Sequence, residues 1–255
     1  MRRSLIRGAV ALALVVGAGG PAMAAEKVEL PSQDWSFTGM FGTFDRAAAQ
    51  RGLQVFLESC AGCHSLDLVA YRNLAALGYS EDEIAAIAAE KEVVDGPNED
   101  GDMFDRPARA SDPFVAPFPN PQAAMASNGG AMPPDLSLIV KARGRGYDYL
   151  YALLTGYREE IPEGVTISDD AYYNVYFPGN QIAMPPPLFD ELVEFADGTP
   201  ATVDQMARDV TVFLAWAASP EMEQRKRIGI GVLIFLIVFT GLLYAYKRKI
   251  WADVH

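Results

Sequence analysis

The run CAGCH at positions 60–64 constrains this chain more than any other feature. Two cysteines three positions apart, followed at once by histidine, are typical of covalent attachment of a c-type haem. Cysteines on one helical turn can form thioethers with the two vinyl groups of a porphyrin, and the next residue then lies beneath the iron. The chain has only two cysteines and two histidines, the other being His255. The pattern predicts one haem c, bound through Cys60 and Cys63, with His64 as an iron ligand.

Two other uses of the paired cysteines have to be weighed. A C-x-x-C pair can be a dithiol redox couple in an exported oxidoreductase, or half of a zinc site. A structural zinc site needs a second pair of Cys or His ligands, and the sequence has none. A thioredoxin-like motif would follow a strand in a β-α-β pattern, and no such pattern is predicted nearby. Haem attachment is therefore favoured over both.

The first 24 residues are typical of a secretory signal peptide. Arg2, Arg3 and Arg7 form a basic region, residues 9–17 form a short apolar core, and the tripeptide AMA ending at position 24 is a small-x-small cleavage site. The segment lacks the Arg/Ser-rich amphipathic character of an organelle transit peptide. We therefore expect export to a bacterial periplasm.

Residues 228–246 are nineteen consecutive residues without a charge, which is the length of one transmembrane helix. Basic triplets at 225–227 and 247–249 flank both ends, so the positive-inside count is a tie. The signal peptide decides the orientation, with the C-terminus in the cytoplasm and the haem domain in the periplasm. We expect a single-pass protein of the bacterial inner membrane, divided into a signal peptide (1–24), haem domain (25–220), linker (221–227), anchor (228–246) and tail (247–255).

The chain is acidic, with a formal net charge of −12. Ten Asp and Glu residues against one Lys lie between Glu81 and Asp105. A surface of this kind repels nucleic acid and attracts basic proteins, so no nucleic-acid partner is expected. The sequence leaves open whether the acidic segment 90–105 serves docking or is a solvated insertion.

Hydrophobic periodicity predicts a mainly helical domain. Residues 25–42 are expected to form an extended arm anchored by Trp35 and Phe37, and loops are expected at 95–121 and 158–201, with room for short hairpins within 90–120 and 160–180. Ser80 with Glu83 and Thr202 with Gln205 match the capping-box pattern. Helices are predicted over residues 44–58, 80–91, 148–157 and from Thr202 to the 218–220 region, with another helix opening at 133–137 and a helical linker at 221–227.

A single imidazole leaves the sixth position of the iron open, and a methionine thioether there would favour electron transfer. Of the candidate methionines at 103, 125, 132, 184, 206 and 222, Met132 and Met184 are both followed by prolines, which stiffen a loop. Met184 is favoured because it lies far from His64 in sequence, shortly before the last helix of the domain. Met132 remains the alternative on these grounds.

The order of these segments resembles the cytochrome c1 family, the haem subunit of the quinol–cytochrome c oxidoreductase (bc1) complex. The resemblance runs through nearly the whole chain after the signal peptide. The stretches that carry it are RGLQVFLESCAGCHSLDLVAYRNL, PFPNPQAAMASNGGAMPPDLSLIVKARG, YDYLYALLTGY and NVYFPGNQIAMPPPLFD, followed by a helix, a basic linker and one anchor. It implies a class I cytochrome c-like haem domain that is mainly α, with long loop insertions and one C-terminal transmembrane helix.

The resemblance also implies residue roles. Met184 matches the axial methionine, while Cys60, Cys63 and His64 match the attachment positions and the proximal ligand. Some bacterial relatives carry a disulfide in the loop before that methionine; this chain has no cysteine left for one, so other packing must hold the loop. The remaining matches are Arg143 and Tyr149 at positions that contact haem propionates, and Pro133 and Pro134 in the pocket segment that accepts a hydrogen bond from the imidazole.

The implied function is electron transfer without bond chemistry in this subunit. The haem would accept an electron from the Rieske iron–sulfur subunit and pass it to a soluble or membrane-tethered c-type cytochrome. Cytochrome b and membrane lipid are the other implied partners. The alternative is a membrane-anchored c-type cytochrome that feeds a terminal oxidase.

Overall fold

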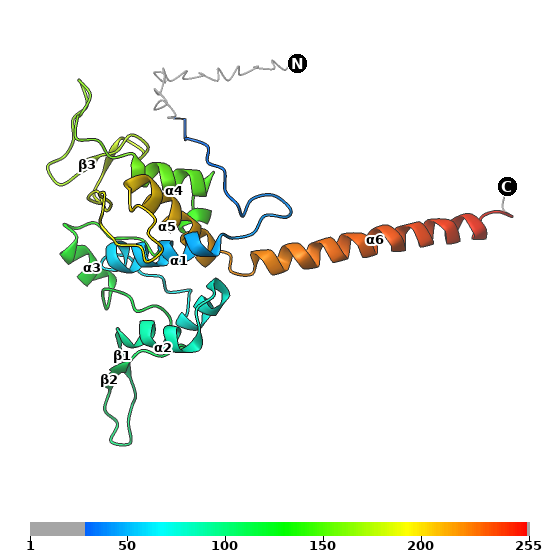
Figure 1. The fold of residues 1–255 in the computed structure, drawn as a ribbon, viewed down its shortest axis with the longest axis horizontal. Helices are drawn as coiled ribbons and strands as arrows, with labels where there is room; N and C mark the ends of the chain where they lie inside the picture. The colour runs from blue at the N-terminus through cyan, green and yellow to red at the C-terminus, as the bar shows by residue number, and fades with distance from the viewer. Residues whose placement is uncertain (1–28, 254–255) are drawn as a thin grey trace, which may run out of the picture.

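The structure is a computed structural model that describes residues 29–253, so the expected signal peptide lies outside the described residues. The described chain is mostly helical, as the periodicity predicts (Figure 1). Its elements are α1 (Arg46–Val55), the π-helix η1 (Phe56–Cys60), the 3₁₀ helix η2 (Tyr71–Leu77), α2 (Glu81–Ala89), β1 (Glu92–Asp95), β2 (Phe104–Pro107), α3 (Pro121–Ser127), the 3₁₀ turn η3 (Ile139–Lys141), α4 (Gly146–Thr155), β3 (Tyr172–Tyr173), β4 (Gln181–Ile182), α5 (Val203–Ala217) and α6 (Met222–Ile250).

Helices α1 and α5 cross at the centre of the domain, and Gly52 allows them to approach closely. A Cβ atom at Gly52 would lie 2.1 Å from the backbone oxygen of Asp209 and 2.8 Å from Cβ of Phe213. Just beyond the C-terminal end of α1, the ring of Phe56 packs against that of Phe213 on α5, with the centroids 5.6 Å apart. The crossing sets the direction in which α1 runs towards residue 60.

An ion pair fixes the same crossing. Arg51 on α1 donates two hydrogen bonds to the Asp209 carboxylate on α5, at 2.7 and 3.2 Å. Burial raises the pKa of Asp209, and the hydrogen bonds from Arg51 and Gln205 counteract that rise. Because Asp209 is only 1% exposed, loss of Arg51 would leave a buried charge without its partner.

The two predicted capping boxes turn out differently. Ser80 caps α2 and the Glu83 side chain returns to the Ser80 backbone, which is the full reciprocal arrangement. The Thr202 hydroxyl caps α5 by accepting from the backbone N–H of Gln205. The Gln205 side chain, however, donates to Asp209 at 3.0 Å and does not bond back to the Thr202 backbone. The second box is therefore only half formed, because the buried carboxylate competes for that side chain.

Two antiparallel pairs of strands lie within or overlap the regions where hairpins were expected. Glu92 pairs with Pro107 and Asp95 with Phe104, while Tyr172 pairs with Ile182. The β1–β2 hairpin extends away from the rest of the domain (Figure 1) and carries most of the acidic segment.

The helix predicted to open at residues 133–137 is wrong. This segment is irregular, and the first helical turn after it is η3. The Asp135 side chain accepts from Ser137 N at 2.9 Å, and Leu136 N donates to Ser65 O at 2.9 Å, so the backbone donors are used elsewhere. Side-chain and tertiary hydrogen bonds of this kind compete with helix formation.

The arm and the C-terminal helix are as expected. Trp35 and Phe37 are buried in the domain core. Helix α6 is continuous from the linker through the apolar run; an eighteen-residue window of it has a mean hydropathy of 2.5, and none of that window is buried within the domain. It projects from the domain by itself (Figure 1), as a single-pass membrane anchor would.

We expect Gly52→Ala to destabilise the domain by about 3 kcal/mol or more, the upper end of overpacking, because the added methyl meets backbone that cannot move aside. The measurement is chemical unfolding of the full chain in detergent, followed by circular dichroism. Ala47→Gly, an exposed change on the same helix, should cost only about 1 kcal/mol. Equal losses in the two variants would contradict the role given to the crossing.

Candidate cofactor site

The π-helix η1 delivers the cysteine motif. Ala61 N donates to Phe56 O at 2.8 Å, a wider turn than in α1, and His64 N donates to Cys60 O at 2.9 Å. The widened turn rotates the end of the helix relative to α1, a distortion that is frequent at functional sites. Cys60 therefore lies at the end of a helix whose other face is fixed in the core, as the sequence predicted.

Both thiols are free rather than joined in a disulfide. Burial, with a smaller contribution from Cys63, raises the pKa of Cys60 to about 12. Dithiol oxidoreductases need a thiol with a lowered pKa, because the thiolate is the attacking species. The surroundings of Cys60 therefore do not suit it as the attacking thiol of such an enzyme.

His64 is oriented by one hydrogen bond. Its Nδ1 lies 2.8 Å from the carbonyl oxygen of Pro134, which can only accept, so Nδ1 carries the proton. Burial lowers the pKa of His64, while the bond to Pro134 opposes that change. A neutral imidazole held in this way leaves Nε2 with a lone pair, which is the form that binds a metal.

The segments on either side of this hydrogen bond are also joined. Asp135 accepts from Ser65 Oγ and from Asp67 N, both at 2.8 Å, and Leu68 N donates to Ser137 Oγ at 3.1 Å. Burial alone would raise the pKa of Asp135, but the hydrogen bonds that its carboxylate accepts from Asp67, Ser137 and Ser65 outweigh burial, and the pKa is lowered. The Pro134 carbonyl is thus held in place by its ionised neighbour.

Met184 lies in the loop after β4, and two side chains hold the backbone of that loop. Tyr157 Oη donates to the Met184 carbonyl at 3.1 Å, and Ser59 Oγ donates to the Pro187 carbonyl at 2.7 Å. Burial raises the pKa of Tyr157, so its phenol keeps its proton and remains a donor. Ser59 directly precedes Cys60, so one contact couples the attachment helix to the methionine loop.

Asn174 holds the segment between β3 and β4, which leads into the methionine loop. It is fully buried, donates to Leu153 O at 2.8 Å, and accepts from Tyr176 N at 3.0 Å. The sequence analysis missed Asn174, Tyr157 and Ser59. A missing disulfide indicated that other packing must hold the loop, but no local pattern indicated which residues do so.

The other candidate methionines are placed differently. Met132 is 57% exposed, while Met184 is partly buried. Met206 and Met222 are packed in the hydrophobic core, and Met103 is exposed on the β1–β2 hairpin. Met125, on α3, is partly buried as Met184 is. Shielding from water therefore favours Met184 over Met132 and Met103, while Met206 and Met222 are taken up by the packing of the core.

The two residues expected at propionate positions lie at and just before α4. Arg143 is exposed, and its Nη1 donates to the carbonyl of the preceding residue at 3.0 Å. Tyr149 is partly buried in the first half of the helix. The neighbouring Arg145 forms an ion pair with Asp148 at 2.9 Å. Arg143, by contrast, takes part in none of the ion pairs found within residues 29–253.

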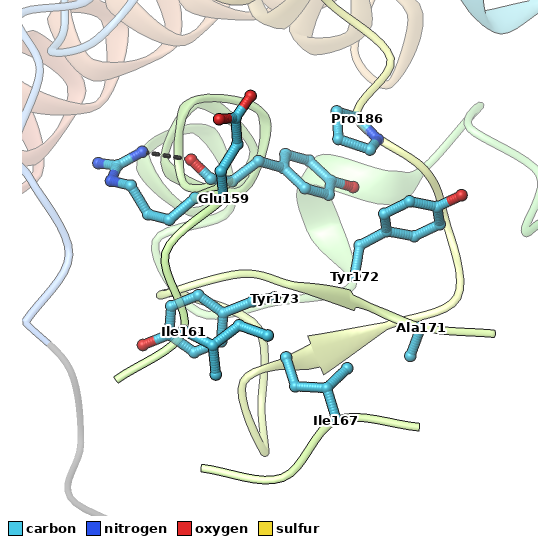
Figure 2. A pocket seen from close by; sticks show the side chains of 9 residues that line it. Glu159, Ile161, Ile167, Ala171, Tyr172, Tyr173 and Pro186 are labelled. Carbon is cyan, nitrogen blue, oxygen red and sulfur yellow. Dashed lines mark hydrogen bonds between the residues drawn. The ribbon is translucent and has the colours of Figure 1, made fainter. Parts of the chain in front are cut away.

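A cavity of about 410 Å³ lies beside the methionine loop. Tyr157 and Pro186 line it, so the cavity borders the methionine loop on the side where Tyr157 holds the Met184 carbonyl. Figure 2 shows Tyr172 and Pro186 near one end of the cavity and Ile161 and Ile167 near the other. A second cavity, of about 290 Å³, borders Ala61 and Gly62 of the cysteine motif.

Comparison with known proteins gives consistent matches. A model described as the Cytochrome C1 family matches residues 35–254. A "Cytochrome c1" of Rhodospirillum rubrum is 50% identical over 264 residues, covering 97% of both chains. A "Cytochrome b/c1" of Bradyrhizobium diazoefficiens is 54% identical over 246 residues, covering 88% of this chain and 36% of that protein. The "Cytochrome c1, heme protein, mitochondrial" of Saccharomyces cerevisiae is 50% identical over 224 residues, covering 88% of this chain and 72% of the yeast protein.

We expect Asp135→Asn to lower stability at neutral pH by about 1–3 kcal/mol, because the variant replaces a charged acceptor of several hydrogen bonds. The pKa of Asp135 is depressed in the folded state, so its contribution is present above the ordinary value of 3.8 and is lost as the pH falls through the folded pKa. The measurement is the unfolding free energy of both proteins against pH. The gap should close on acidification, and parallel profiles would contradict this. The control is Asp67→Asn, at an exposed neighbour, which should change the unfolding free energy at neutral pH by less than about 0.5 kcal/mol.

Proposed function

This chain belongs to the cytochrome c1 family, and on that premise we propose that it is the haem-bearing electron-transfer subunit of a quinol–cytochrome c oxidoreductase (bc1) complex. In this role it accepts one electron from the Rieske iron–sulfur subunit and passes it to a periplasmic c-type cytochrome, soluble or membrane-tethered. Quinol oxidation takes place on partner subunits, with cytochrome b among them. The chain is thus part of an enzyme and makes or breaks no substrate bond itself.

The hydrogen bond from His64 Nδ1 to the Pro134 carbonyl is the observation that carries this proposal. It occupies Nδ1 and so leaves Nε2 as the nitrogen available to a metal, in the residue that directly follows Cys63. Thiols, a tautomer-fixed imidazole and a thioether form the donor set that a covalently bound haem with two axial ligands requires. Cys60 and Cys63 would hold the group and His64 would bind its iron.

Met184 is our proposed second ligand. A haem with His and Met ligands supplies a one-electron centre of raised reduction potential. A thioether is a weak ligand, so its backbone has to be held where the sulfur can reach the metal. Tyr157 and Ser59 do this from two directions, which supports Met184 where no disulfide is available.

Arg143 and Tyr149 are proposed to bind the propionates. A guanidinium without an acidic partner is free to make a bidentate contact with a carboxylate, and a phenol can donate to it. Pro133 is assigned to the same pocket segment as Pro134, where its ring limits the backbone and so keeps the carbonyl aimed at His64.

Helix α6 anchors the domain in the inner membrane, with the haem domain in the periplasm and the C-terminus in the cytoplasm. Its unburied apolar surface supports the span. The acidic surface of the domain, including the β1–β2 hairpin, would attract a basic electron acceptor with a strong dependence on salt. The alternative of a carrier that feeds a terminal oxidase has less support, because the relatives are named cytochrome c1 or b/c1.

We expect the protein purified in mild detergent to give a pyridine haemochrome spectrum of covalent haem c and to retain a di-haem cytochrome b and an iron–sulfur protein. A colourless protein with free thiols would contradict the cofactor assignment. A haem protein that instead retains a terminal oxidase would support the carrier alternative.

We expect Met184→Leu to lower the reduction potential by on the order of 0.1 V or more and to let the ferrous iron bind carbon monoxide, because leucine has no donor atom. Redox titration and visible spectroscopy measure both effects. Met132→Leu, at an exposed methionine, should change neither. The reverse pattern would move the ligand assignment to Met132.

A further inference from the structure

The turn at residues 38–43, here called the apolar tip, has no role in the core. Met40 is 59% exposed and Phe41 is 79% exposed. Phe41 is thus more exposed than the most exposed large apolar residue of the membrane helix α6, which is Ile237 at 72%. An aromatic ring held this far in water costs free energy unless something apolar covers it.

The tip is held in a defined shape. Thr43 N donates to Ser36 O at 3.1 Å, and Thr38 donates to Trp35 O through both its amide and its hydroxyl. At its base the buried rings of Phe37 and Phe44 pack with centroids 5.2 Å apart. Gly39, with φ of 72°, makes the left-handed turn that brings Met40 and Phe41 to the apex.

Helix α6 fixes where the tip lies. Lys226 Nζ donates to Phe37 O at 2.8 Å and to Gly42 O at 2.9 Å, so it holds both sides of the turn. Glu223, one turn earlier, accepts from Phe44 N at 2.7 Å. Figure 1 shows the tip as the blue loop beside the first turns of α6, projecting in the direction in which that helix runs.

The height of the tip matches the expected membrane surface. Lys226 lies two residues before the uncharged run, which is about 3 Å along a helix axis. A turn bonded to Lys226 therefore lies at the boundary of the hydrocarbon, where aromatic side chains are favoured. The exposed Arg225 and Arg227 beside it supply positive charge, although the domain as a whole is acidic.

We propose that the apolar tip inserts Met40 and Phe41 into the interfacial layer of an anionic lipid bilayer, as a second membrane contact beside α6. The inference rests on α6 spanning the membrane, as the proposed function has it. A domain attached to the bilayer by one helix can tilt about the point where that helix enters. A second, rigid contact beside the helix restricts this tilt. The second contact would therefore fix the orientation of the domain over the bilayer.

The test is spin labelling of the full haem-loaded chain in vesicles of phosphatidylcholine and phosphatidylglycerol. With both native thiols in thioethers, an introduced cysteine is the single reactive thiol, and unlabelled wild-type protein verifies this. Met40→Cys is compared with Met103→Cys, since the two methionines are equally exposed at 59% and 61% but Met103 lies on the distant β1–β2 hairpin. The measured quantity is the accessibility of each label to oxygen relative to a water-soluble nickel complex.

We expect that ratio to be several-fold higher at position 40 than at position 103. Equal ratios would overturn the proposal. The proposal would also be overturned if the nickel complex reached position 40 freely in vesicles but neither oxygen nor nickel reached it in the assembled complex. The tip would then contact a protein subunit instead of lipid. Phe41→Cys repeats the measurement at the second apolar side chain, and a label at Leu242→Cys in α6 has to report bilayer depth; if it does not, the anchor itself is refuted rather than the tip.

Discussion

The close approach of α1 and α5 at Gly52 is the constraint on which the remaining arrangement depends. It is possible only because residue 52 lacks a side chain where the backbone of Asp209 passes, and the Arg51–Asp209 ion pair fixes the register of the contact. From this crossing, α1 continues through a π-helix to Cys60, while α5 leads after a short turn to α6. One contact therefore relates the attachment site to the membrane helix.

The candidate site is assembled from loops, and each loop is held by a hydrogen bond from a distant part of the chain. The Pro134 carbonyl accepts a hydrogen bond from the His64 imidazole. The hydroxyls of Tyr157 and Ser59 donate to the carbonyls of Met184 and Pro187, respectively. Loops held in this way can place weak ligands without a disulfide, because hydrogen bonds to backbone carbonyls fix position directly.

Much of the fold was predictable where the signal was local. The cap at Ser80, the helices around 44–58 and 202–218, and the apolar run of α6 follow from side-chain periodicity and capping chemistry, which act within a few residues. Residues 133–137 were predicted as a helix and are not one, because Ser65 and Asp135 take their backbone donors. The half-formed box at Thr202 fails for a similar reason, since Gln205 bonds to Asp209 instead.

The sequence by itself determined which chemical groups the chain offers. The CAGCH motif, the proline-flanked methionines and the uncharged run of α6 can be recognised from residue type and spacing alone. Only the tertiary structure decided which groups support that chemistry. Ser59 and Pro187 are remote in sequence, as are Lys226 and the turn that presents Phe41, and no local pattern encodes such pairs. Their contacts exist because the packed helices bring their ends together, so they appear only when the chain is folded.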